Sequence, residues 1–162
     1  MAENATILSA GDAEQGAFVF RHPLDAAYGC RLSPISRIAG LESGAINHVS
    51  IAPGEQGFPL HRHHGQEEWV YVLSGEGEVL LDDSVTAIGP GAFVVFPAAK
   101  EAHAVRNPGT SDLVCLMGGT APAADVIDLP ELGQRVIKSA NGFEAAPVDV
   151  FTVKNPFPSP KG

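Results

Sequence analysis

The stretch from His61 to Gly75 constrains this chain more than any other part of the sequence. It holds three histidines in four residues, then two glutamates, and then an aromatic and β-branched run that stops at Gly75. Imidazole and carboxylate groups placed just before a strong strand signal are typical of a metal site mounted on a sheet. The stretch therefore predicts a metal centre carried by β-structure.

The spacing within this stretch predicts which side chains share a face. Residues two apart on a strand point the same way, so His61 and His63 would face inward and Arg62 outward. An unbroken strand would place Glu68 on the opposite face, but Gly65 permits a turn or bulge that resets the alternation. Two neutral imidazoles and one carboxylate form an open site suited to Fe(II), Mn(II), Ni(II) or Zn(II).

Other polar residues compete for places at this centre. A further ligand is expected from another strand, and His103 is the best candidate because it follows the apolar run 91–97. Glu67 is the alternative to Glu68 as the carboxylate ligand. His64 is offset from the paired histidines, so we expect it to be exposed or to support the site from behind.

Short segments with strand-like composition follow one another at close spacing, separated by Gly- and Pro-containing turns. This pattern is typical of an all-β sandwich or barrel. We expect strands at 17–20, 45–51, 68–73, 78–81, 85–88, 92–96, 102–106, 112–117 and 147–153.

The two ends of the chain have a weaker pattern than the middle. Residues 1–43 predict an irregular N-terminal segment apart from 17–20. Asp128, Pro130 and Glu131 match the start of a short helix that would end by about Lys138. Alternate prolines make 155–160 an extended tail. We expect one domain over residues 1–162, with a barrel core at about 44–120 and an irregular C-terminal extension.

Composition limits the partners and the compartment. The 162 residues include ten basic and nineteen acidic side chains, for a net charge of −9. Nucleic acids and anionic membranes require basic patches, so we expect neither as a partner. No apolar run approaches the roughly 20 residues that span a bilayer, and the N-terminus lacks a signal-peptide pattern, which predicts the cytoplasm.

The cysteines add little to the functional prediction. Cys30 and Cys115 are the only two, and neither lies in a Cys-x-x-Cys pair. A zinc-finger or redox-motif interpretation therefore has no support. Cys115 lies in an apolar run, where a cysteine is usually a small buried hydrophobe.

The spacing of these histidines, the glutamate and the glycines resembles that of the cupin superfamily. The first cupin motif reads Gly, a spacer, His-x-His, three or four residues, Glu, six residues, Gly. His61-x-His63, four residues, Glu68, six residues and Gly75 match it, with a spacer of six residues after Gly54 instead of the usual five.

The second cupin motif is matched by Gly91, Pro97, His103 and Asn107. The family's Pro-x-Gly turn reads Pro97-Ala98-Ala99 here, and one extra residue separates Pro97 from His103. The likeness also extends past residue 117 to a group of single-domain bacterial cupins, some of which carry a sugar-phosphate isomerase label.

The resemblance implies a small antiparallel β-barrel of jelly-roll type, also called a double-stranded β-helix, with the metal near one mouth. Its ligands would be His61, His63, Glu68 and His103. The resemblance also implies a homodimer that exchanges terminal strands, for which the proline-rich tail could serve.

Three functions follow as hypotheses. The first is a metal-dependent enzyme that isomerises or epimerises a sugar or sugar phosphate, with zinc or manganese polarising a substrate oxygen. The second is an iron-dependent dioxygenase. The third is a non-catalytic protein that binds a small carbohydrate or other metabolite. Arg106 could contact a substrate phosphate, although a solvated surface role is the simpler interpretation.

Overall fold

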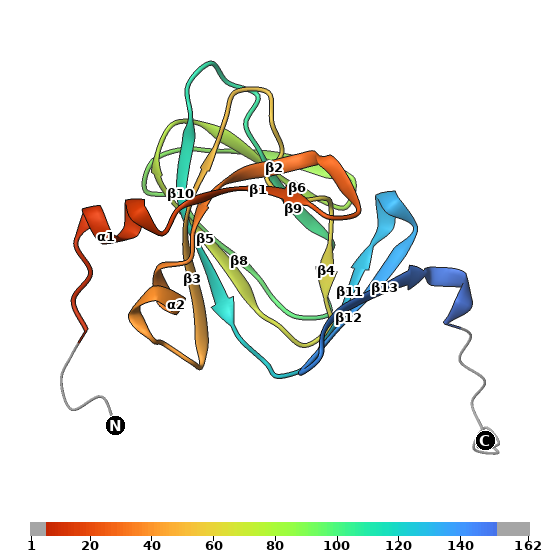
Figure 1. Ribbon diagram of the computed structural model, residues 1–162. Coiled ribbons are helices and arrows are strands. Elements are labelled where there is room, and N and C mark those ends of the chain that lie inside the picture. Colours follow the sequence, from red (N-terminus) through yellow and green to blue (C-terminus); the bar gives the residue numbers. More distant parts are fainter. Residues whose placement is uncertain (1–5, 152–162) are drawn as a thin grey trace.

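The barrel wall consists of antiparallel sheets in the computed structural model, which describes residues 6–151 (Figure 1). The largest sheet has the order β1-β2-β3-β10-β5-β8. Its strands are β1 (Phe18–His22), β2 (Asp25–Ser33), β3 (Gly44–Ile51), β10 (Leu113–Thr120), β5 (Glu68–Ser74) and β8 (Phe93–Phe96). The predicted all-β antiparallel barrel is confirmed.

Two smaller sheets complete the described structure. One has the order β13-β12-β11-β4 and the other β7-β6-β9. Their strands are β4 (Arg62–His63), β6 (Gly77–Leu81), β7 (Ser84–Ile88), β9 (His103–Arg106), β11 (Asp125–Leu129), β12 (Gln134–Ser139) and β13 (Gly142–Pro147). The helices are α1 (Ala10–Gln15), α2 (Ile35–Ala39), η1 (Pro130–Leu132) and η2 (Val148–Val150). None of them is long and apolar enough to cross a membrane.

The core is built on the central strands of the large sheet. On β10, Leu113 lies opposite Ile51 of β3, and Cys115 lies between Val49 of β3 and Val72 of β5. All five side chains are buried. Such apolar cross-strand rows hold neighbouring strands in register, since a one-residue slip would turn them to solvent. The buried position predicted for Cys115 is confirmed.

The N-terminal segment is more regular than the sequence predicted. The strand at 17–20 is present as β1, but β2 pairs with both β1 and β3, and so extends the large sheet. Within the described residues 6–43, the prediction of an irregular segment is therefore wrong. Its helices are only six and five residues long, too short for a periodic signal in the sequence.

The C-terminal helix was predicted wrongly. The capping pattern around Pro130 produces a single 3-10 turn, which ends at Gly133 with φ of 59°. The chain then continues as β12 and, after Asn141-Gly142, returns as β13. Asn-Gly is a strong hairpin signal. Pairing of β12 with β11 on one side and β13 on the other outweighs the weak helical preference of residues 134–139. The strand predicted at 147–153 is displaced, because β13 ends at Pro147. The predicted tail at 155–160 lies outside the described residues.

A pair of backbone hydrogen bonds joins the segments that carry the two sequence motifs. The amide of His61 donates to the carbonyl of His103 over 3.0 Å, and the amide of His103 donates to the carbonyl of His61 over 2.8 Å. Just after β9, the buried Asn107 ties the chain to β3 and to the following turn, because its side-chain amide donates to the carbonyls of Ile51 and Ser111. The Asn of the second motif is thus a structural clamp.

Two tight turns at positions of the cupin motifs place a residue in the left-handed region of backbone conformation, at Gly75 and Ala99. Gly75 has φ of 79°, and a Cβ there would lie 2.2 Å from the carbonyl oxygen of Asp112. Only glycine fits that turn. Ala99 occupies the place of the glycine in the Pro-x-Gly turn and also has positive φ, 57°. Its amide donates to the carbonyl of His63 over 2.8 Å. The turn therefore keeps the left-handed geometry although its residue is alanine.

This geometry predicts that Ala99→Gly stabilises the protein. The left-handed region costs a residue with a Cβ roughly 1–2 kcal/mol, and glycine's greater freedom in the unfolded chain offsets about half of that gain. We expect a net increase of about 0.5–1 kcal/mol in the free energy of unfolding, measured by urea denaturation at unchanged m. Ala98→Gly, which gains only unfolded-state freedom, should be destabilised. A less stable Ala99→Gly protein would contradict the prediction.

Candidate metal centre

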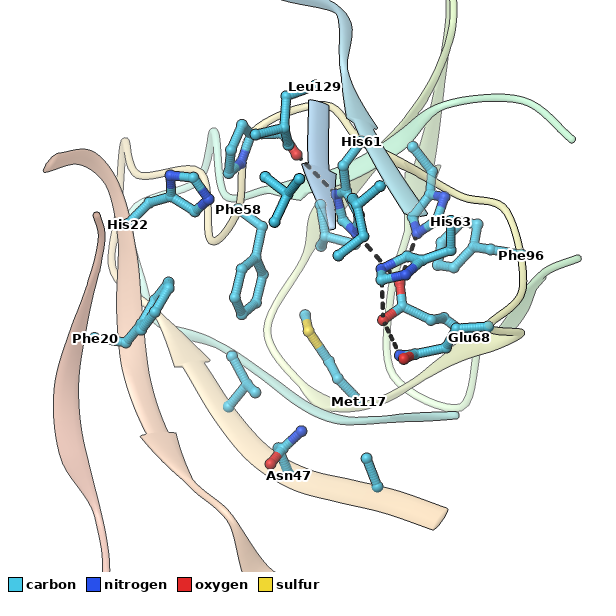
Figure 2. Close-up of a pocket in the computed structure, with 18 of the residues that line it drawn as sticks. Phe20, His22, Asn47, Phe58, His61, His63, Glu68, Phe96, Met117 and Leu129 are labelled. Atoms are coloured by element: carbon cyan, nitrogen blue, oxygen red, sulfur yellow. Dashed lines mark hydrogen bonds and ion pairs between the residues drawn. The ribbon is translucent and has the colours of Figure 1, made fainter. Parts of the chain in front are cut away.

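The carboxylate of Glu68 lies among three imidazoles at the start of β5 (Figure 2). Its Oε2 is 3.2 Å from Nε2 of His61 and 2.9 Å from Nε2 of His103. Its Oε1 is 3.4 Å from Nε2 of His63. These residues come from β4, β5, β9 and the bridge residue before β4. The structure thus brings together the four side chains that the sequence singled out.

Three of the four form a compact group of donor atoms. One atom each from His61, His63 and Glu68 lies within 4.8 Å of the other two. His103 lies outside this group of three and is joined to it through Glu68. Glu67, the alternative carboxylate, is exposed, and its backbone amide donates to Thr120 instead.

The partners of the two paired histidines decide which ring nitrogen carries the proton. Nδ1 of His61 lies 2.8 Å from the carbonyl oxygen of Pro59, which can only accept. Nδ1 of His63 lies 2.6 Å from the carboxylate of Asp125. Both Nδ1 atoms therefore donate, and in the neutral rings both Nε2 atoms present a lone pair toward Glu68.

His103 is held mainly by packing. Its ring stacks on Phe96 with the centroids 3.9 Å apart and the planes 2° from parallel. It is 5% exposed, and its Nδ1 is buried without a hydrogen-bond partner among the described residues. The stacking fixes the plane of the ring and directs Nε2 at Glu68.

The donor set fits a divalent cation. Lone pairs of neutral imidazoles that converge on an ionised carboxylate repel one another unless a positive charge lies between them, whether a proton or a metal ion. Nitrogen and carboxylate oxygen donors suit zinc, manganese, iron and nickel. The Nδ1 partners, Pro59 and Asp125, are of the kind that orient histidine ligands in metalloproteins.

The ionisation of these groups agrees with this assignment. Burial raises the pKa of Glu68, but hydrogen bonding with His103 and with the protonated form of His61 outweighs it and holds the pKa well below its usual range. Burial, aided by the charge of His61, keeps the pKa of His103 below its usual value despite Glu68. Burial also lowers the pKa of His61, but Glu68 outweighs it and raises the pKa overall. A bound cation would replace the proton that His61 otherwise attracts.

Asp125 is a supporting residue that the sequence did not reveal. Its carboxylate is fully buried. Besides His63, it accepts hydrogen bonds from the amides of Gly65, at 2.7 Å, and Val126, at 2.8 Å. The break at Gly65, predicted as a reset of strand alternation, is thereby fixed against β11. No local pattern around Asp125 signals this role, because His63 and Gly65 lie some 60 positions earlier in the chain.

A second polar cluster surrounds Asp128 on the other face of β4. Its carboxylate binds Arg62 at 2.9 Å, His64 at 2.8 Å and Arg135 at 2.6 Å. Hydrogen bonding to Arg135 is the main reason that the pKa of Asp128 lies far below its usual value. Arg62 faces away from the centre as predicted, and His64 is among the exposed residues of this cluster. Neither side chain is directed at Glu68.

The four central residues line a cavity of about 510 Å³ inside the barrel. Figure 2 shows the cavity extending from His61 and Glu68 past Met117 toward Asn47. This volume is typical of small-molecule sites. Gln66, another residue not singled out from the sequence, also lines the cavity, and its amide donates to Oε1 of Glu68 over 2.8 Å.

Comparison with known proteins places the fold in a family. A family model described as a cupin domain matches residues 47–119. The solved structure of a protein proposed to be a sugar phosphate isomerase, from Acidithiobacillus ferrooxidans, is 30% identical with a TM-score of 0.86. That match covers 92% of this chain and 96% of the other. The chain belongs to the cupin superfamily.

Other relatives resemble this cupin less closely or over shorter lengths. A cupin-superfamily sugar phosphate isomerase from Silicibacter pomeroyi shares the fold at 24% identity, with a TM-score of 0.76 over 86% of this chain and 90% of that one. SchB of Streptomyces halstedii is 36% identical over 90 residues, and the alginate biosynthesis protein AlgA of Pseudomonas fluorescens is 34% identical over 64. These two matches cover 54% and 40% of this chain, and 64% of SchB and 13% of AlgA.

The hydrogen bond to His63 predicts that Asp125→Asn weakens metal binding. The asparagine amide would no longer hold the His63 tautomer as a carboxylate does, and loss of such a partner costs about 10- to 100-fold in affinity. Titration with Zn²⁺ or Mn²⁺ in competition with a chromogenic chelator measures the change. Asp128→Asn is the matched control, since Asp128 lies on the same strand and contacts no proposed ligand. Equal affinity of the Asp125 variant and wild type would contradict the prediction.

Proposed function

We propose that this cupin is a metal-dependent enzyme that acts on a small oxygen-bearing metabolite. His61, His63, Glu68 and His103 would hold one divalent ion, which is zinc, manganese, iron or nickel. The observation that carries the proposal is the convergence of three imidazole Nε2 atoms on the Glu68 carboxylate at the wall of the cavity. When bound, the ion would supply Lewis-acid chemistry toward a substrate oxygen.

The protein's own residues would prepare this site in three ways. Pro59 and Asp125 hold the His61 and His63 rings with Nε2 facing inward. The depressed pKa keeps Glu68 ionised at neutral pH. Apolar residues make up most of the cavity wall around the centre, and such surroundings strengthen electrostatic interactions inside the cavity.

Isomerisation or epimerisation of a sugar or sugar phosphate is the reaction that the relatives favour. Support comes from the 30% identical protein of Acidithiobacillus ferrooxidans, which is itself proposed to be a sugar phosphate isomerase. The apolar cavity favours a second candidate, an iron-dependent dioxygenase, because such a lining suits the body of a hydrophobic substrate. A carbohydrate-binding protein without catalysis is the remaining hypothesis, and turnover distinguishes it from both enzymes.

The first test measures metal and turnover together. Purified wild-type protein should contain close to one divalent ion per chain by elemental analysis and should lose thermal stability when a chelator removes it. Glu68→Gln should bind the ion more than tenfold more weakly because it removes a charged ligand. Its neighbour Glu67→Gln should match wild type, since Glu67 is exposed and turned away.

Proton NMR in D₂O tests for isomerase activity on a panel of aldoses, ketoses and their phosphates. Isomerisation through an enediol would exchange the substrate's α-proton, and His61→Ala should abolish this exchange. Absence of bound metal, with a melting temperature unchanged by chelator, would refute the metal-dependent proposal. Oxygen consumption by the iron-loaded protein would favour the dioxygenase, and ligand-dependent stabilisation without turnover would favour the binding protein.

We also propose that the protein forms a homodimer through the outer face of the large sheet. Tyr71 and Leu73 of β5 and Phe93 and Val95 of β8 are 39–61% exposed, and Tyr71 pairs directly with Phe93. β8 is the edge strand of this sheet. An apolar group of this kind at an open edge is typical of a surface covered by another chain.

Light scattering tests the dimer at micromolar concentration. We expect twice the 16.9 kDa mass of the chain, and Phe93→Arg should shift the protein toward the monomer by placing a charge in the apolar face. Val85→Arg is the matched control, because Val85 is similarly exposed, at 53%, but lies on β7 of another sheet. A monomeric wild type would refute the proposal.

Two buried, unbridged cysteines are consistent with the further proposal of a reducing compartment such as the cytoplasm.

A further inference from the structure

The cavity beside the metal centre has an almost entirely apolar wall. Within residues 6–151, no lysine, arginine, serine, threonine or tyrosine lines it. Phe20 and Phe58 stand on one side with their ring centroids 5.2 Å apart, and Met117, Val49 and Leu129 contribute aliphatic surface. Figure 2 shows Phe20 and Phe58 across the cavity from Glu68.

The few polar side chains in the wall are mostly committed to other partners. Gln66 donates to Glu68, and the four central residues interact with one another. His22 accepts a hydrogen bond at Nδ1 from the amide of Leu24, so its neutral ring carries the proton on Nε2 and can offer one donor. Asn47 makes no side-chain hydrogen bond within the described part of the chain and points into the cavity in Figure 2. Outside the centre, the described wall therefore offers a ligand few free polar side chains, among them Asn47, His22 and the indole N–H of Trp69.

The basic residues near the barrel interior are turned elsewhere. Arg106 pairs with Glu78 at 2.7 Å and is absent from the cavity wall, which its neighbour Val105 lines. Arg62 and Arg135 are bound to Asp128 outside the cavity. The phosphate-binding role considered for Arg106 in the sequence thus has no support from its position.

This wall is poorly suited to a phosphorylated sugar. Proteins bind phosphate with arginine, lysine or clustered backbone amides, because a buried dianion without them loses its hydration uncompensated. Each sugar hydroxyl buried without a partner also loses the hydrogen bonds that it makes to water. The aromatic or aliphatic surface of a ligand, by contrast, binds favourably against these walls, because the gain in free energy grows with the apolar area removed from water.

We infer that the ligand of this cavity is a compact, unphosphorylated molecule with an apolar body and an oxygen donor at one end. The oxygen end lies at the metal centre, and the aromatic or branched aliphatic body packs against Phe20, Phe58 and Met117. Asn47 binds a single polar group at the far end. Only the placement of the oxygen end at the metal centre rests on the proposed function. The apolar body of the ligand is inferred from the cavity wall alone.

Paired hydroxamates test the substrate class. Benzohydroxamate and acetohydroxamate carry the same metal-binding group and differ only in the body, so calorimetric titration of the metal-loaded protein isolates the contribution of the wall. We expect benzohydroxamate to bind at least tenfold more tightly. Fructose 6-phosphate and inorganic phosphate, each at millimolar concentration, should neither displace it nor shift the melting temperature.

A matched pair of variants tests whether the preference for benzohydroxamate arises from the cavity wall. Met117→Gln keeps the length of the side chain but makes it polar, and should reduce the preference for benzohydroxamate at least threefold. Leu116→Gln changes the adjacent residue of β10, which does not line the cavity, and should leave the preference unchanged. If Met117→Gln fails to fold, Phe58→Leu, which keeps the wall apolar but removes the ring, should likewise lower the preference.

The possible results separate this inference from the proposed function. A protein that binds no metal refutes the proposed function and the oxygen end of the ligand together. A metal-loaded protein that binds both hydroxamates equally, or binds fructose 6-phosphate more tightly than benzohydroxamate, leaves the metal centre intact and overturns the inference.

Discussion

The rest of this site depends on one backbone bridge, between His61 and His103. Two backbone hydrogen bonds pair the segments before β4 and at the start of β9, and the two imidazole rings lie with their centroids 4.4 Å apart. Neither segment carries a complete site by itself. The bridge brings the two motifs side by side, and Glu68 of β5 completes the group of side chains.

The C-terminal strands belong to the site although they follow the part of the chain that matches the cupin domain. β11 pairs with β4 through Ile127 and Asp128, and from this strand Asp125 reaches His63 and Gly65 while Asp128 binds Arg62 on the other face. Removing either carboxylate would leave buried or half-buried donors without partners, which costs more than the net gain of a hydrogen bond. The histidine stretch is therefore held from both faces by a strand far away in the sequence.

Family membership determines the fold, whereas the lining of the cavity determines the ligand. Membership of the cupin superfamily establishes the barrel, but one fold carries many activities and the lining of the site decides what binds. Here a polar centre opens onto a wall that is almost wholly apolar, with Asn47, His22 and the indole of Trp69 as isolated polar positions. The label of sugar phosphate isomerase attached to relatives and the surface of this cavity point to different substrates, and our inference follows the cavity.

Local sequence alone determined the barrel strands from β3 to β10, the inward pair His61 and His63, and the outward Arg62, because strand alternation and glycine turns are encoded by neighbouring residues. Glycine positions marked the turns between these strands, and the spacing of the cupin motif favoured Glu68 over Glu67. Tertiary structure decided the rest. Gln134–Ser139 is a strand rather than a helix because β11 and β13 flank it, and Asp125 supports His63 only because β11 folds back onto β4. These contacts join residues far apart in the chain, so no local pattern could reveal them, and the same is true of the apolar wall that selects the ligand.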